Sequence, residues 1–252
     1  MSDTFGRPVL AVRIHAGFNA AAFLAGLLAL TDQTSGTASA YLCSLFPEIP
    51  CGIAFGARSV NGISGFGARI LTEPEHAHRH PGDILEIYAQ SRLSDAAKAK
   101  AAQVWRVLAE AEGRVHNAPP ECVHFHEVGR MGNILAIGLC AEFLTTIEPA
   151  EIVSSPIPLG DGTVKCAHGF VPYPAPAMFQ MLEGVAVRGY AGEGEPVTPT
   201  GLALLKGFGA RFGAWPKMTP ERTATVFSER YFEDVPNGTL FAMGPALPAD
   251  EA

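Results

Sequence analysis

The hydrophobic residues of this chain fall into short runs separated by small polar breaks, and the first two runs predict a strand followed by a helix. Residues 8–15 are almost wholly apolar, as in a buried strand, and the Ala- and Leu-rich residues 18–31 predict a helix packed on it. Gly17 and Asn19 stand at the turn between them. In many α/β proteins such a turn faces the ligand, but this one carries no phosphate-loop or dinucleotide pattern, so it indicates little about function.

Later runs predict more helices and strands. Residues 94–115 have Ser94 as a helix N-cap and an apolar stripe that includes Val104 and Trp105, which indicates an amphipathic helix. The Gly-rich residues 61–67 predict a hairpin connection, with a binding loop as the alternative. The remaining predicted elements are strands at residues 53–58, 67–71, 151–155, 222–230 and 239–243, and helices at residues 83–91, 133–146 and 200–208.

Together these elements predict an α/β or α+β fold in which helices cover a mixed sheet. From residue 156 onward Pro and Gly become frequent, so the second half should be rich in ordered loops, which commonly present functional groups. With 252 residues and 48% hydrophobic content, the chain is long enough for a real core. We expect a single domain over residues 1–252, with two subdomains divided near residue 150 as the alternative.

Charge and cysteine content narrow the function classes. A net charge of -7, with 18 Lys and Arg residues and no basic run, argues against a nucleic-acid partner held by phosphate contacts. The five cysteines are odd in number and form no Cys-x-x-Cys, so neither a disulfide framework nor a zinc finger is indicated, and a reducing cytoplasm fits best. A small molecule or another protein is the expected partner.

One feature points toward export instead. Arg7 and Arg13 precede the apolar residues 16–30, and Ala38-Ser39-Ala40 is similar to a signal-peptidase site. Against export, the apolar run is interrupted by Asn19 and is too short to span a bilayer as a helix. We therefore predict a soluble protein without a membrane segment.

The most concentrated chemistry lies in His124-Phe125-His126-Glu127-Val128-Gly129. If this stretch is extended, successive side chains alternate faces, so His124 and His126 share one face. Neutral imidazoles bind Zn, Ni, Cu or Fe, and Glu127 could orient a ligand or accept a proton. The alternative is a pair of ordinary hydrogen-bonded histidines at a strand end.

Three other stretches carry candidate chemistry, each with a structural alternative. His76, His78 and His80 form a Pro-bounded, His-rich loop that can capture a metal or serve as a solvated linker. Cys166 and His168 could supply a thiolate and an imidazole, or be a buried thiol and a capping histidine. The segment Thr198-Pro199-Thr200-Gly201 precedes a predicted helix whose free N–H groups could bind a phosphate or carboxylate, or merely cap the helix.

Taken together, these motifs resemble a known family. His124 to Gly129, Lys165-Cys166-Ala167-His168-Gly169 with the Pro-rich residues 172–177, and Thr198 to Gly201 are similar in order and spacing to the LarC family. That family inserts nickel into the pyridinium bis-thiocarboxylate mononucleotide cofactor of lactate racemase. The resemblance extends from about residue 9 to residue 244.

The resemblance also shows departures. It covers only the N-terminal part of the family's usual length; members generally continue into a C-terminal domain associated with CTP use and oligomer formation, so a CTP requirement is in doubt here. Four positions that are acidic in the family's pattern are not acidic in this chain: Arg13, Ala21, Gly132 and Ala136. Carboxylates hold Mg²⁺ or Mn²⁺, whereas imidazole and thiolate suit Ni and Zn. We therefore expect an oxygen-ligated metal or nucleotide-dependent step to be lost or altered, while transition-metal or sulfur-ligand binding could survive.

What the resemblance implies is nickel insertion, with nickel or another divalent transition metal bound in the cytoplasm and a nucleotide-like cofactor precursor as partner. The implied roles are metal binding by His124 and His126, catalysis by Glu127, Cys166 and His168, and cofactor binding by Thr198, Thr200 and Gly201. Because metal ligands must be deprotonated, uptake should weaken as the pH drops through the histidine range.

Two alternatives stay open. One is a catalytically degenerate relative that serves as a partner subunit or cofactor carrier, with another protein supplying the missing C-terminal domain. The other is a metal-dependent hydrolase built on His-x-His-Glu, which would need a third ligand that the sequence does not identify.

Overall fold

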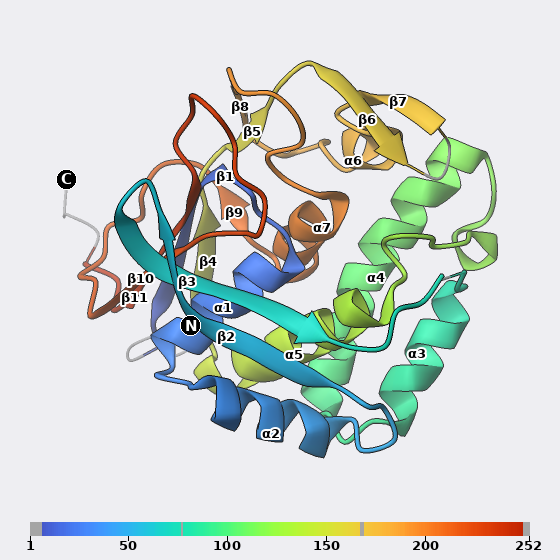
Figure 1. The fold of residues 1–252 in the computed structure, drawn as a ribbon, viewed down its shortest axis with the longest axis horizontal. Helices are drawn as coiled ribbons and strands as arrows, with labels where there is room; N and C mark the ends of the chain where they lie inside the picture. Colours follow the sequence, from blue (N-terminus) through green and yellow to red (C-terminus); the bar gives the residue numbers. More distant parts are fainter. Residues whose placement is uncertain (1–6, 77, 167–168, 249–252) are drawn as a thin grey trace.

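The centre of the structure, a computed structural model that describes residues 7–76, 78–166 and 169–248, is a seven-stranded mixed sheet (Figure 1). Its strands, in spatial order, are β2 (Gly52–Val60), β3 (Ile63–Leu71), β10 (Arg222–Val226), β11 (Gly238–Gly244), β1 (Val9–Ala16), β4 (Glu151–Ser154) and β9 (Arg211–Phe212). Strand β1 pairs antiparallel with β11 and parallel with β4, so the first strand of the chain lies between two strands from its second half.

Two small strand pairs and the helices complete the fold. Strands β5 (Ile157–Leu159) and β8 (Val187–Gly189) pair in parallel, and β6 (Gly162–Cys166) and β7 (Gly169–Tyr173) form a hairpin. The helices are α1 (Ala20–Leu30), α2 (Ser35–Leu45), α3 (Pro81–Gln90), α4 (Asp95–His116), α5 (Met131–Ile147), α6 (Pro176–Gln180) and α7 (Pro199–Gly207), with a short 3₁₀ turn at Pro120–Cys122. The predicted α/β class is confirmed.

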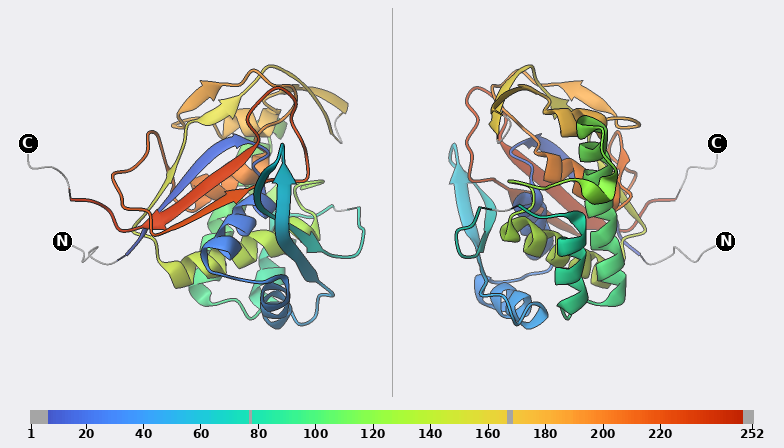
Figure 2. Two further views of the ribbon diagram at one scale, coloured as in Figure 1. Left: turned by 60° about the vertical axis from the view of Figure 1, so that its left-hand side comes forward. Right: turned by 90° about the vertical axis from the view of Figure 1, so that its right-hand side faces the viewer.

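The sheet uses its two faces differently. In β1 the side chains alternate, so Leu10, Val12 and Ile14 belong to the large core shared with the helices, whereas Val9 and Ala11 join a smaller apolar cluster on the other face. Figure 2 shows α1, α4 and α5 gathered on one side of the sheet. The helical face therefore carries most of the buried apolar surface that stabilises the fold.

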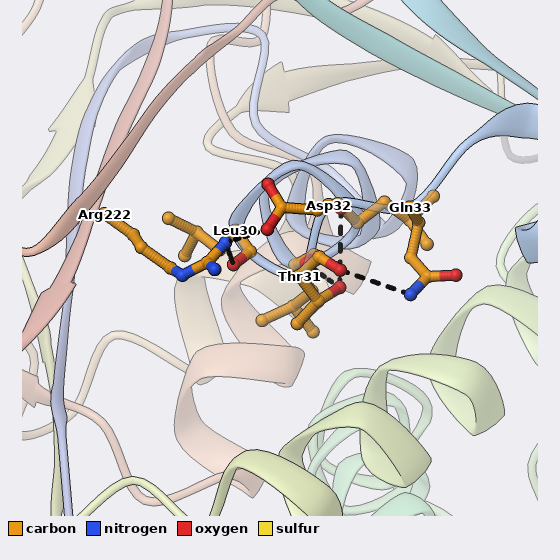
Figure 3. A network of polar contacts seen from close by, with 7 residues as sticks. Leu30, Thr31, Asp32, Gln33 and Arg222 are labelled. Carbon is orange, nitrogen blue, oxygen red and sulfur yellow. Dashed lines mark hydrogen bonds and ion pairs between the residues drawn. The ribbon is translucent and has the colours of Figure 1, made fainter.

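Helix α1 is apolar on every side because it is enclosed by the sheet and by other helices. Its N-cap Asn19 accepts a hydrogen bond from the Ala22 N–H at 2.9 Å. At its other end, drawn in Figure 3, the Thr31 hydroxyl donates to the Leu27 carbonyl at 2.8 Å and the Arg222 guanidinium donates to the Leu30 carbonyl at 3.0 Å. A cation beside the last carbonyls is stabilising at a helix C-terminus, so both ends of α1 are fixed.

The structure contains the predicted hairpin, but its turn is shorter than predicted. Residues 61–67 were expected to form the connection, but β2 runs to Val60 and β3 begins at Ile63, which leaves only Asn61 and Gly62 in the turn. Both have positive φ, 53° and 76°, as a two-residue Asn-Gly hairpin turn requires. Glycines within a strand were mistaken for turn residues. The hairpin runs across α1 and α5 (Figure 1).

Helix α2 was not predicted, and Ala38-Ser39-Ala40, the sequence that is similar to a peptidase site, lies inside it. Its N-cap Thr34 and Thr37 form a reciprocal capping box, a signal that the sequence contains. Within the described residues, none of the helices combines the length and the apolar character needed to cross a membrane.

One close contact between helices yields a stability prediction. A Cβ atom added at Gly207 would lie 2.6 Å from the Val104 Cα and 2.8 Å from its amide nitrogen, which are backbone atoms of α4. Gly207→Ala should therefore force α7 away from α4 and lower the free energy of unfolding by about 1–3 kcal/mol. The matched control is Gly82→Ala in α3, where an added Cβ meets nothing within 4 Å. Urea denaturation of both variants checks this, and equal effects would contradict it.

Candidate functional site

A cavity of about 870 Å³ lies where the sheet, three helix starts and two loops meet. The β1–α1 turn contributes Gly17, Phe18 and Asn19 to its lining, and the loop after β3 contributes residues 72–76. The remaining lining comes from β3, from the first turn of α1, from Glu127 and Glu195, from the starts of α5 and α7, and from the connection between β10 and β11. Because it is built from segments far apart in the chain, the cavity could not be recognised from any one motif.

The N-cap residues of α1, α5 and α7, which are Asn19, Arg130 and Thr198, all line this cavity. Helix N-termini carry partial positive charge and free N–H groups, so their convergence favours an anionic ligand. Arg130 adds a full positive charge from an exposed side chain. Because five glutamates also line the cavity, Glu73, Glu75, Glu127, Glu195 and Glu229, the anion-attracting part is confined to these helix starts.

Backbone pairing holds the starts of α1 and α7 together. The N–H groups of Gly17 and Phe18 donate to the Pro196 carbonyl at 2.8 and 2.9 Å, and the Thr198 N–H donates to the Phe18 carbonyl at 3.0 Å. A Cβ at Gly201 would lie 2.9 Å from the Phe18 carbonyl oxygen, so glycine permits this close approach.

Beside the cavity the structure brings the His-rich loop and the central motif together. The His78 ring centroid lies 4.3 Å from that of His124 and 5.2 Å from that of His126, and the His80 centroid lies 3.8 Å from that of His124. We call these four residues the imidazole cluster. His76 and Glu127, neighbours of the cluster in the chain, line the cavity, so the two features share a border.

The cluster is assembled by residues that were not predicted to matter. Arg79 and Phe125 exchange two backbone hydrogen bonds, of 3.2 and 2.8 Å, which pair the loop with the motif. Glu75 accepts two hydrogen bonds from Arg79, at 3.0 and 2.7 Å, and a further one from the Met131 N–H at the start of α5. Arg79 also donates to the Gly129 carbonyl at 2.8 Å. We call this arrangement the Glu75–Arg79 clamp.

The electrostatics of the cluster favour a neutral imidazole at His124. The pKa of His124 is lowered by loss of hydration and by the like charges that His80, His78 and His126 would carry, against an opposing effect of Asp83. Neutral imidazole is the form that binds metals. In the described ranges, however, no three His, Cys, Asp or Glu side chains are placed so that they could hold a metal ion together. The rings are gathered but do not converge on one point.

The sequence-predicted residues divide into three groups. His124, His126 and Glu127 lie in or beside the shared border, as do His78 and His80 of the loop. Thr198 lines the cavity, while Thr200 lies behind it with its hydroxyl 2.9 Å from that of Thr198, and Gly201 packs on the β1–α1 turn. The Cys166 side chain and His168 lie outside the described residues.

Three of the four positions where the family's pattern is acidic face the cavity: Ala21, Gly132 and Ala136 line it. Arg13 does not; its guanidinium donates to the Gly213 carbonyl at 2.9 Å and lies 5.1 Å from the Trp215 ring on the outer face of the sheet. The departures noted in the sequence therefore fall mainly on the cavity lining.

Sequence reasoning missed several lining residues. Glu195, Phe227, Ser228 and Arg230 come from loops that carry no recognisable motif. The β1–α1 turn was noticed, but without a phosphate-binding pattern its place in the site could not be inferred.

Fold and site together define the class: an α/β protein that brings an imidazole-rich surface to the edge of an anion-attracting cavity. Comparison with known proteins identifies the family. The sequence profile of the family described as nickel insertion protein matches residues 10–248, so the chain belongs to that family.

The names of individual relatives agree with this family assignment. The chain is 37% identical over 200 residues, 79% of its length and 51% of the relative's, to a protein of Geobacter metallireducens that is named for nickel insertion. A second relative is the pyridinium-3,5-bisthiocarboxylic acid mononucleotide nickel insertion protein of Geobacillus kaustophilus. The two sequences are 39% identical over 172 residues, which are 68% of this chain and 42% of the relative. The matches thus span about half the length of these relatives or less. No solved structure matches the chain significantly.

The Glu75–Arg79 clamp gives a testable prediction. Glu75→Gln should leave the half-buried Arg79 guanidinium without its anionic partner, and we expect the free energy of unfolding to fall by about 1–3 kcal/mol. Hydrogen exchange in residues 72–80 should speed up more than in α4. Arg79 holds the pKa of Glu75 below its usual range, which is consistent with a favourable pair in the folded state.

The matched control is Glu73→Gln in the same loop, since Glu73 is exposed. It should change stability by no more than about 0.5 kcal/mol. If the two variants behave alike, the clamp does not hold the loop.

Proposed function

We propose that this chain binds nickel at the imidazole cluster and delivers it to a pyridinium thiocarboxylate mononucleotide held in the adjacent cavity. The observation that carries the proposal is the shared border of cluster and cavity, where His76 and Glu127 line the cavity beside rings 3.8–5.2 Å apart. A short path between a metal-binding surface and a small-molecule site is what metal transfer requires. Family membership supplies the metal and the substrate class.

On the metal side, the ligands are His124 and His126 together with His78 and His80. His78 and His124 are exposed, so their rings can turn toward an incoming ion, whereas the His80 ring is held by a hydrogen bond of 3.0 Å between its Nδ1 and the Val123 carbonyl and would offer its other nitrogen. Imidazole is a suitable ligand for nickel, and binding by neutral rings releases few protons. In this scheme nickel is a substrate that is first bound by imidazole nitrogens and is then transferred to the thiocarboxylate sulfurs.

On the substrate side, the start of α7 receives the phosphate. Thr198 faces the cavity, and its hydroxyl lies 2.9 Å from that of Thr200 and accepts the Gly201 N–H at 3.2 Å. A phosphate would therefore meet the Thr198 hydroxyl at the positive end of α7, with Thr200 and Gly201 holding that hydroxyl in place. The thiocarboxylate sulfurs would then lie toward His76 and Glu127. Sulfur is softer than imidazole nitrogen and competes well for nickel, which favours transfer in that direction.

Glu127 is the proposed proton acceptor on the transfer path, because its exposed carboxylate lines the cavity next to His126. Cys166 and His168 remain proposed participants on the strength of the sequence motif. We place the reaction in the cytoplasm, where Cys43, Cys51, Cys122 and Cys140 would stay thiols.

A nickel titration tests the metal side. Wild type should bind nickel stoichiometrically at neutral pH, and His124→Ala/His126→Ala should bind it roughly tenfold or more weakly, because two of its ligands are gone. The matched control is His116→Ala at the end of α4, which removes an imidazole that lies 3.4 Å from Glu112 and outside the cluster. Calorimetry with metal analysis of the dialysed proteins gives the readout, and equal affinity in wild type and double variant would refute the site.

One observation favours a second candidate function, a carrier without turnover. Ala21, Gly132 and Ala136 leave the cavity without the carboxylates that the family's pattern places there. A carrier would bind nickel and the mononucleotide but release the mononucleotide unmetallated. Mass spectrometry of the nucleotide after incubation with nickel-loaded protein separates the two: nickel in the released product supports insertion, and unchanged nucleotide supports the carrier.

A further inference from the structure

Another part of the cavity wall carries polar side chains that the proposed nickel transfer does not use. It consists of Glu195, in the connection between β8 and α7, and Arg230, between β10 and β11. Tyr173 lies close to both Glu195 and Tyr190, with its buried hydroxyl beside the Val197 backbone. The buried Tyr190 hydroxyl has no hydrogen-bond partner within the described part of the chain, which is rare in folded proteins.

Glu195 itself is short of hydrogen-bond donors. The structure gives its carboxyl group neither a hydrogen bond nor an ion pair with any described residue, and its side chain is partly buried. Arg230 acts on it only through charge, because the guanidinium lies over the Phe232 ring at 4.9 Å. The result is a partly buried acceptor that faces a ligand cavity and that the described protein groups leave unpaired.

The chemistry of the acceptor decides which ligand group fits it. An ionised carboxylate accepts hydrogen bonds and donates none, and a phosphate at neutral pH is also mainly an acceptor. A phosphate would therefore leave Glu195 unsatisfied, whereas a vicinal diol offers two O–H donors to its two oxygens. In a mononucleotide, the ribose carries that diol.

The position of Glu195 relative to the phosphate site agrees with this assignment. Glu195 and Thr198 lie three residues apart, at most about 10 Å along an extended chain. Both line the cavity from a segment that the Pro196 and Thr198 backbone groups fix to the β1–α1 turn. A ribose whose phosphate rests at Thr198 can place its hydroxyls near Glu195.

We propose that Glu195 selects ribonucleotides in this cavity by accepting hydrogen bonds from both hydroxyls of the ribose diol. The inference rests on the proposed function and specifies its substrate class. It assigns no step of the metal transfer to Glu195, which acts in binding alone.

The pH dependence follows from the groups that face Glu195. Burial raises the pKa of Glu195 to about 7, and the charge of Arg230 opposes that rise. Burial also raises the pKa values of Tyr173 and Tyr190, so both hydroxyls stay neutral at the pH values of interest. Since the diol needs the ionised carboxylate, ribonucleotide binding should weaken as the pH falls from about 8 to about 6. A phosphate at the same place would show the opposite trend.

The experiment uses the full chain without nickel and two probes, pyridinium-3-carboxylic acid mononucleotide and its 2′-deoxy counterpart. At pH 8, wild type should bind the ribose form about tenfold or more tightly, the effect of a hydrogen bond to a charged group. Glu195→Gln should bind both probes with similar affinity and lose the pH dependence. The matched control Glu193→Gln changes an exposed carboxylate in the same loop and should behave like wild type.

The outcomes separate the two proposals. Equal binding of both probes by wild type, or tighter binding at low pH, overturns the role of Glu195 and leaves the nickel proposal standing. Absence of mononucleotide binding overturns both. Because the two-probe comparison needs only wild type, it remains decisive even if Glu195→Gln fails to fold.

Discussion

The site depends on the sharp turn between β1 and α1. Gly17 has φ of 82°, and a Cβ there would lie 2.3 Å from the Ser228 hydroxyl oxygen. Only glycine combines that left-handed backbone with so close a neighbour. Through Gly17 and Phe18 the turn binds the segment before α7, while Ser228 brings in the connection between β10 and β11. One backbone conformation thereby sets the relative positions of three walls of the cavity.

A second constraint acts on the metal side. An imidazole cluster on a long loop would lose its order to chain entropy unless the loop were fixed elsewhere. Arg79 supplies this fixation by pairing with Phe125 through the backbone and with Glu75 through its side chain. The His78 and His124 rings stay exposed, while the His80 ring is held by its Nδ1 contact of 3.0 Å with the Val123 carbonyl. A rigid frame with adjustable side chains is suited to a metal that must be accepted and then released.

Much of the fold was readable from the sequence because periodicity and caps are local signals. The strand at β1, the helix after Ser94 and the helix after Thr198 follow from residues close together in the chain. The meeting of His78 with His124 was not predictable, since it depends on a backbone pairing between distant segments. Glu195 escaped notice for a related reason: an isolated glutamate in a Gly-rich loop gives no signal until its burial is known. In the hairpin, glycines that belong to strand β3 were predicted to be turn residues. Only Asn61-Gly62 has the specific sequence of a two-residue hairpin turn.

The apolar residues at Ala21, Gly132 and Ala136 change what the cavity can attract. Carboxylates near helix N-termini are stabilised by the helix dipole and partly neutralise its field. With no carboxylates at these positions, the starts of α1 and α7 keep positive potential for an external anion, whereas Glu75 already accepts a hydrogen bond from the Met131 N–H at the start of α5. The other carboxylates of the lining, Glu73, Glu127 and Glu229, confine a favourable anion position to these helix starts. Glu195 does not cancel this effect, because it lies in the loop ahead of α7 and its charge is weakened by burial. One nucleotide can therefore place its phosphate at the helix starts and its ribose diol at Glu195 within the same cavity.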